Sequence, residues 1–158
     1  MGDIKVKDKN YTHVNKKFVH VFNEILAWEE ASLKETCKKE KLTMREVHIM
    51  EAVSSLAKEN KNTMANISKF LAVTPGSCST SVNILVNKGF LEREYTPSDR
   101  RVIFINLTEK GEKINSLHNE IHKDVIEKIS ESLSEKETEF FEIILDKLDE
   151  IFANFQRR

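Results

Sequence analysis

Along residues 63–107 the spacing of apolar residues changes from helical to alternating, which predicts two short helices followed by a β-hairpin. Thr63 is a residue type that caps helix N-termini, and Ile67, Phe70 and Leu71 follow it at helical spacing. We therefore expect a first short helix that begins after Thr63 and buries these three apolar side chains.

A second helix is predicted to begin at Thr74, a good N-cap, with Pro75 at the first helical position, where its missing N–H costs nothing. Gly89 marks its end, because glycine tolerates the left-handed conformation past a helix terminus. One face is apolar and consists of Cys78, Val82, Leu85 and Val86. The opposite face carries small polar residues, which are Gly76, Ser77, Ser79, Thr80, Asn83 and Asn87. Such a face suits the major groove of DNA, and it fits an ordinary solvated surface equally well.

Residues 90–95 and 102–107 alternate apolar and polar positions, as two strands with one buried face do. Pro97 sets the turn between them, and the tip carries three charged residues, Asp99, Arg100 and Arg101. An arginine at such a tip suits a narrow minor groove, where the negative potential is strongest. The alternative is a hairpin with ordinary surface charges.

Longer helices are predicted on either side of this region, at residues 11–38 and 109–156. Ser134 and Glu137 have the spacing of a capping box at the start of the last helix. That helix has an apolar stripe that is wide for a small monomer, formed by Phe140, Phe141, Ile144, Leu145, Leu148, Ile151, Phe152 and Phe155. Burial against a second copy is the simplest explanation, and packing within one chain is the alternative.

The composition fits a helix-rich protein, with 39% hydrophobic and 32% charged residues in a chain of 158, long enough for one domain with a core. The net charge is −1, but residues 61–107 carry six basic and three acidic residues, so this segment is +3 and the remainder is −4. That excess favours a few phosphate contacts rather than indiscriminate binding. No apolar run approaches the ~18 residues that span a membrane, and the N-terminus lacks an apolar signal core. With two cysteines expected to be reduced thiols, we expect a cytoplasmic protein that does not contact membranes.

Four segments together resemble the MarR family of bacterial transcription regulators. They are Leu42-Thr43-Met44-Arg45-Glu46, Val86-Asn87-Lys88-Gly89-Phe90-Leu91-Glu92-Arg93, Asp99-Arg100-Arg101 and Leu107-Thr108-Glu109-Lys110-Gly111. The resemblance covers nearly the whole chain, and the wing pattern followed by Leu-Thr-Glu-Lys-Gly is specific. It implies a mainly α winged helix-turn-helix fold with a small β-hairpin wing, a MarR-like homodimer, a pseudo-palindromic operator in double-stranded DNA, and a ligand that switches DNA affinity.

On this basis we expect residues 1–158 to form a single MarR-type domain. The winged-helix DNA-binding lobe is expected at residues 43–107, and the dimerisation region in the helices at residues 11–38 and 109–156. The expected DNA contacts are Thr74, Ser77, Ser79, Thr80, Asn83, Lys88, Asp99, Arg100 and Arg101. The second short helix has no arginine or lysine before Lys88, a position range where relatives often carry one.

His118 and His122 are four residues apart, so both point to one side of a helix and can bind one metal ion through ring nitrogens. Two interior histidines with ordinary hydrogen bonds are the alternative. Together with Glu30 and His48, the pair resembles the main metal site of zinc-responsive MarR repressors, although those repressors have a further Glu where Val47 stands. The resemblance implies a closed site of three nitrogens and a carboxylate for Zn²⁺; no cofactor is otherwise expected.

A second branch, the repressors of bacterial fatty-acid synthesis genes, is similar over longer stretches. The similar segments are Glu46-Val47-His48, Thr74-Pro75-Gly76-Ser77, residues 117–129 and Ser132-Leu133-Ser134-Glu135. This resemblance implies a long-chain acyl group on acyl carrier protein as corepressor. Phe18, Phe22, Leu117 and Ile121 are expected to line its pocket, although ordinary core packing uses the same residues.

Enzyme activity is not expected. The chain has only four glycines and contains neither G-x-x-x-x-G-K-[ST] nor G-x-G-x-x-G, and Asn119 after His118 rules out H-E-x-x-H. We therefore expect a sequence-specific repressor of fatty-acid synthesis genes that answers to acyl-acyl carrier protein. A zinc-responsive repressor is the alternative, and a winged helix used only for protein contacts is the alternative from another class.

Overall fold

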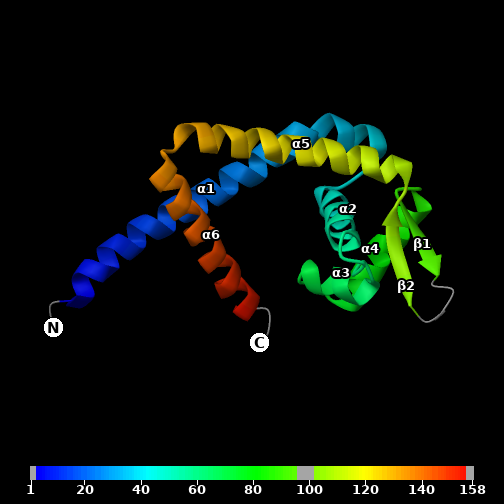
Figure 1. Cartoon of the computed structure of the whole chain (residues 1–158), viewed down its shortest axis with the longest axis horizontal. Helices are drawn as coiled ribbons and strands as arrows, with labels where there is room; N and C mark the ends of the chain where they lie inside the picture. The colour runs from blue at the N-terminus through cyan, green and yellow to red at the C-terminus, as the bar shows by residue number, and fades with distance from the viewer. Residues whose placement is uncertain (1–2, 96–101, 156–158) are drawn as a thin grey trace. The chain divides into compact units, whose positions relative to one another are not determined.

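A computed structural model describes the backbone of residues 3–95 and 102–155 and the side chains of residues 11–95 and 102–155. Within these ranges the chain forms six α-helices and a two-stranded antiparallel sheet (Figure 1). The elements are α1 (Asp3–Glu40), α2 (Met44–Ala57), α3 (Met64–Phe70), α4 (Pro75–Asn87), β1 (Leu91–Tyr95), β2 (Ile103–Leu107), α5 (Glu109–Ser132) and α6 (Glu135–Phe155). The predicted mainly helical fold with a small hairpin is confirmed.

The chain divides into two compact units, Met1–Met44 and Arg45–Arg158. The first unit is mainly α1. The rings of Phe18 and Phe22 stack on it with centroids 6.5 Å apart. Both rings are exposed, as are further large apolar side chains of this helix, which are Tyr11, Val14, Val19, Val21, Ile25 and Leu26.

In the second unit, α2, α3, α4 and the hairpin form a winged-helix lobe (residues 45–107) with a core of its own. The largest buried side chains of the lobe are Val47, Ile49, Met50, Val53, Ile67, Val82, Leu85, Phe90, Leu91 and Ile105. α3 lies against α4 and both helices contact the hairpin, which can be followed in Figure 1. Residues from all these elements are buried together, so the lobe closes around one apolar centre.

The hairpin is fixed at its base by Asn62, the residue before the α3 N-cap. β1 and β2 pair antiparallel, with Leu91 opposite Leu107. The Asn62 side-chain amide donates to the carbonyl oxygen of Ile105 over 2.9 Å and to Asn106 Oδ1 over 2.7 Å. The backbone N–H of Ile105 returns a bond to the Asn62 carbonyl over 2.9 Å. Because a buried amide needs such partners, Asn62 ties β2 to the start of α3.

The Leu-Thr-Glu-Lys-Gly segment joins the hairpin to α5, and its residues Thr108, Lys110 and Gly111 each contact the end of α4 or the start of the hairpin. Thr108 caps α5, because its hydroxyl oxygen accepts from the Gly111 N–H over 3.2 Å, and the same hydroxyl donates to the Gly89 carbonyl over 2.6 Å. A Cβ at Gly111 would overlap the carbonyl oxygen of Phe90. Lys110 places its ammonium 3.9 Å from the centre of the Phe90 ring. The segment therefore anchors α5 directly onto the core of the lobe.

Two local predictions can be compared with the structure. Phe70 was expected to be buried, but it is the last residue of α3 and its side chain is 54% exposed, so that expectation is wrong. Of the capping box predicted for α6, the structure shows the bond from the Ser134 N–H to the Glu137 carboxylate, and the Ser134 hydroxyl also donates to that carboxylate. α6 itself has no residue classed as buried within its described length. Within the described residues, no helix is long and apolar enough to cross a membrane.

Candidate nucleic-acid interface

α4 is positioned by signals that the sequence displays. The Thr74 hydroxyl oxygen accepts from the Ser77 N–H over 3.2 Å, and Pro75 occupies the first turn. Gly89 follows the helix with a φ of 75°, a conformation that favours glycine. The apolar side of α4 is anchored in the core by Cys78, Val82 and Leu85, which are at most 1% exposed. The opposite side is thereby fixed as the outward face.

Burial also makes Cys78 an inert part of this anchor. Its thiol lies 3.6 Å from the Met64 sulfur, and desolvation raises the pKa of Cys78 above its ordinary value, although the charge of Arg45 opposes this shift. A thiol with a raised pKa is a poor nucleophile at neutral pH. The interpretation of Cys78 as a packing residue agrees with these observations.

The predicted DNA contacts of α4 lie on its polar side. Thr74, Thr80 and Asn83 are exposed, and Ser77 and Ser79 are partly exposed. The Thr80 hydroxyl donates to the Gly76 carbonyl over 3.0 Å, and a Cβ at Gly76 would meet nothing within 4 Å. The side chains are short, so a groove can approach the helix backbone closely, and their hydroxyls and amide can bond base edges or phosphates.

Lys88 is engaged within the lobe. Its ammonium lies 2.7 Å from Glu46 Oε1, and the Glu46 side chain is only 8% exposed. A carboxylate that is so little exposed needs a cationic or hydrogen-bonding partner, so this pair joins the start of α2 to the end of α4. The sequence pattern does not predict this pairing. A DNA contact by Lys88 remains a prediction.

Two arginines from outside α4 reach its polar side, and the sequence analysis missed both. Arg45 of α2 donates through Nη2 to Ser77 Oγ over 2.7 Å. Arg93 of β1 donates through Nη2 to Asn83 Oδ1. Arg93 lies opposite Ile105, on the side of β1 that carries Leu91, and its own side chain is exposed.

The tip residues Asp99, Arg100 and Arg101 lie outside the described residues, so their roles stay predictions. The strands that lead to the tip are described. They remain paired as far as Tyr95 opposite Ile103, and the Asn106 amide donates to Glu94 Oε2 over 2.7 Å between them. The hairpin is thus held together up to the base of the tip.

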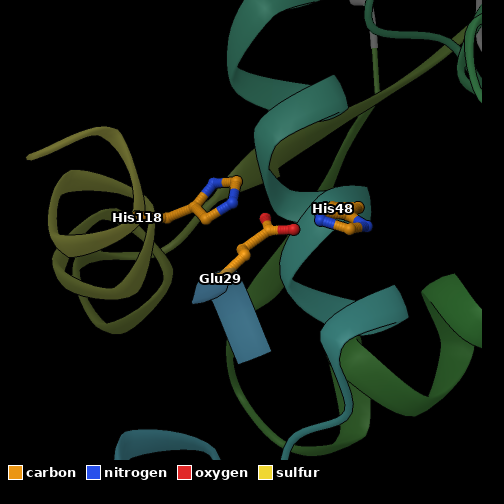
Figure 2. Close-up of side chains that lie close together, drawn as sticks. All are labelled: Glu29, His48 and His118. Atoms are coloured by element: carbon orange, nitrogen blue, oxygen red, sulfur yellow. The ribbon is translucent and has the colours of Figure 1, made fainter. Parts of the chain in front are cut away.

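Three histidines gather in the second unit. His118 of α5 is fully buried, and Nε2 of His122 lies 2.9 Å from its Nε2. The ring of His48 on α2 has its centroid 5.6 Å from that of His118, and Figure 2 shows both side chains. Glu51 of α2 places a carboxylate oxygen 3.9 Å from His118 Nδ1. Imidazole nitrogens supported by a carboxylate are a donor set that fits Zn²⁺, and they also form ordinary buried networks.

The remaining predicted site residues are divided between the two units of the chain. Glu30 of α1 is exposed, whereas its neighbour Glu29, labelled in Figure 2, is 4% exposed. The predicted acyl pocket combines Phe18 and Phe22 of the first unit with the partly exposed Leu117 and Ile121 of the second. Both the complete metal set and the acyl pocket therefore stay predictions.

Similarity to known proteins identifies the family. A family model described as transcriptional regulator SarA/Rot matches residues 32–117. The chain is 29% identical over 85 residues to YhjH of Bacillus subtilis (strain 168), an uncharacterized HTH-type transcriptional regulator, and the alignment covers 54% of this chain and 47% of YhjH. The chain thus spans about half the length of this curated relative.

Solved structures extend the similarity over almost the whole chain. Streptococcus pneumoniae FabT, solved in complex with DNA, is 33% identical with a TM-score of 0.81, covering 92% of this chain and 99% of that chain. A MarR family transcription regulator is 21% identical with a TM-score of 0.70, covering 98% and 97% of the two chains, and shows the same fold. The fold is therefore that of the MarR regulators that the sequence resembles. Because the SarA/Rot family model matches more than half of this chain, the chain belongs to the SarA/Rot family of transcriptional regulators.

Proposed function

We propose that this chain is a sequence-specific repressor that binds duplex DNA through α4 and the hairpin. The observation that carries the proposal is the two-sided construction of α4. One side is buried in the core, and the other presents short polar side chains beside a hairpin. That arrangement places a rigid helix for the major groove and a wing for the backbone or the adjacent groove. The similarity to FabT, which was solved in complex with DNA, supports it.

The repressor is proposed to act as a homodimer. Large apolar side chains of α6 are exposed in the single chain, including Phe140, Ile144, Phe152 and Phe155. Exposed apolar surface of this extent is rare on monomers and marks association sites. A two-fold dimer presents two copies of α4, which matches the two half-sites of a pseudo-palindromic operator.

Fluorescence anisotropy on a labelled promoter duplex from beside the chain's own gene tests DNA binding. We expect binding that weakens steeply as salt rises, because phosphate contacts release counterions. Light scattering on the same protein should give twice the chain mass. Absence of salt-dependent binding to DNA, with the lobe folded, would instead favour a winged helix used for protein contacts.

The proposed targets are fatty-acid synthesis genes, with long-chain acyl-acyl carrier protein as corepressor. The segment resemblance to that branch of repressors and the 33% identity with FabT support this assignment. The test adds acylated carrier protein, or unacylated carrier protein as the control, to the anisotropy assay. Tightening by the acylated form alone is expected, and equal affinity in both conditions would reject this corepressor.

The second candidate is a zinc-responsive repressor, and the observation that favours it is the cluster of His48, His118 and His122. These residues would supply three nitrogen ligands, and a carboxylate of α1 would supply the fourth. DNA affinity is measured in chelator and again with Zn²⁺. Zn²⁺-dependent tightening that His118→Ala abolishes would support the proposal, and Glu29→Gln and Glu30→Gln would then show which carboxylate takes part. Binding that is indifferent to Zn²⁺ would reject it.

A further inference from the structure

The polar side of α4 lacks cationic side chains of its own. Lys88, the cation that follows the helix, is paired with Glu46. DNA-binding surfaces nevertheless obtain most of their affinity from cations that reach phosphates. Positive charge beside α4 must therefore come from another element of the lobe.

Arg45 and Arg93 meet the requirement, because each extends from a neighbouring element onto α4. Arg45 donates to Ser77 over 2.7 Å, and Arg93 donates to Asn83. Both arginines are exposed, and both acceptors are neutral. Within the described part of the chain, neither guanidinium forms an ion pair with a carboxylate, whereas Lys61, Lys88 and Lys113 each have one. The two positive charges are therefore uncompensated there, and each guanidinium has further N–H donors to offer.

The local position of Arg45 is unfavourable for a cation. Arg45 lies in the first turn of α2, where the helix dipole disfavours a positive charge. A residue that departs from such a local rule without a structural gain tends to mark a functional site. Arg93 is exposed on the side of β1 that carries buried Leu91, opposite Ile105, so its guanidinium is accessible.

The geometry of α4 places the two guanidiniums on its two flanks. At about 3.6 residues per turn, Ser77 and Asn83 are roughly 120° apart around the helix axis, with Thr80 midway between them, and about 9 Å apart along it. A helix in the major groove has a phosphate strand on each side. Cations on both flanks can therefore reach phosphates of both strands while Thr80 faces the bases.

We propose that Arg45 and Arg93 are phosphate-binding residues of the DNA interface, held on the flanks of α4 by Ser77 and Asn83. They supply the cationic groups that α4 lacks. This inference rests on the proposed DNA-binding function and adds to it the source of the charge. Ser77 and Asn83 then act partly as positioning residues, because they orient the guanidiniums before DNA arrives.

The test measures the affinity of the dimer for the promoter duplex over a range of salt concentrations, with Arg45→Gln, Arg93→Gln and the wild type. Each substitution is expected to reduce the magnitude of the slope of log affinity against log salt by about 0.9 for each phosphate that is no longer neutralised, or about 1.8 for a two-fold dimer. Affinity at physiological salt should fall by about ten-fold or more for each variant, on promoter and scrambled duplexes alike. Lys113→Gln, which removes one positive charge from α5, is the matched control and should leave both quantities unchanged.

Arg45→Lys and Arg93→Lys keep the positive charge but lose the planar guanidinium with its several N–H donors. These variants should therefore retain most of the salt slope of the wild type. A variant that binds with wild-type affinity and slope overturns the inference while the proposed DNA binding stands. Lower affinity with an unchanged slope also overturns it, because the arginines would then only hold α4 in place. If the wild type shows no salt-dependent DNA binding, the proposed function itself fails, and the inference falls with it.

Discussion

The winged-helix lobe and α6 belong to the same unit of the chain but differ in how far their apolar side chains are buried. In the lobe, Phe90, Val82 and Leu85 are fully buried, whereas Phe140 and Phe155 of α6 are 66% and 63% exposed. Burial of apolar surface is what stabilises a fold. The lobe therefore has an apolar core of its own, whereas the large apolar side chains of α6 are exposed among the described residues. The difference agrees with the proposed roles, in which the lobe binds DNA and α6 packs against a second copy of the chain.

Phe90→Ala should have the largest effect, a loss of stability in the winged-helix lobe. Phe90 is fully buried, carries Lys110 over its ring and lies where the hairpin meets α5. Its truncation should cost about 3–5 kcal/mol of unfolding free energy through lost transfer energy and a cavity. Phe70→Ala is the matched control, because Phe70 is half-exposed. Urea unfolding followed by circular dichroism separates the two, and similar losses would contradict the described core.

Gly111→Ala should have the next largest effect. The added Cβ would overlap the Phe90 carbonyl, so the end of the hairpin or the start of α5 must shift. We expect a loss of about 1–3 kcal/mol, the usual range for overpacking. Gly76→Ala is the control, because its Cβ meets nothing within 4 Å and should raise stability by about 0.4–1 kcal/mol. Thermal unfolding of both variants checks this, and a neutral Gly111→Ala would remove the packing reason for that glycine.

Phe152→Glu tests the role of the exposed apolar residues of α6. The side chain is 49% exposed in the single chain, so its replacement should change the lobe's own unfolding free energy by less than about 0.5 kcal/mol. A charge placed within the apolar stripe should nevertheless dissociate the proposed dimer. Sedimentation velocity should show monomers for this variant and dimers for Glu150→Gln, which alters a polar position of the same helix. A variant that stays dimeric would place the subunit contact elsewhere.

Ser134→Ala should have the smallest effect, confined to the start of α6. The hydroxyl and N–H of Ser134 hold the pKa of Glu137 below its ordinary value. A lowered pKa contributes stability that is present above the pKa of the unfolded chain and is lost as the pH falls through the folded value. Removal of the hydroxyl should raise the Glu137 pKa toward its ordinary value and weaken this acid sensitivity. An NMR titration of the Glu137 carboxyl measures it, and an unchanged pKa would exclude the hydroxyl as the cause.

Helix ends and the hairpin could be predicted from the sequence because they depend on local chemistry. Thr74, Pro75 and Gly89 carry their conformational preferences wherever they occur, and the strands place the apolar residues Leu91 and Ile105 in the core. Phe70 was misjudged because helical spacing gives direction but not how far a helix continues, and α3 ends there.

The candidate interface was predicted only in part. The polar residues of α4 follow from helical spacing, but the Lys88–Glu46, Arg45–Ser77 and Arg93–Asn83 pairs join residues that are 10 to 42 positions apart. Such pairs depend on tertiary packing, which single-sequence patterns do not encode.

A hydroxyl-radical footprint of the protein on its promoter duplex tests the central claim most directly, because it reports the recognition lobe and the proposed dimer together. The account predicts two protected segments related by two-fold symmetry, with centres about one helical turn of DNA or a multiple of it apart. A single protected segment would contradict the paired arrangement. Uniform or absent protection, under conditions where the protein is folded, would contradict sequence-specific recognition by α4.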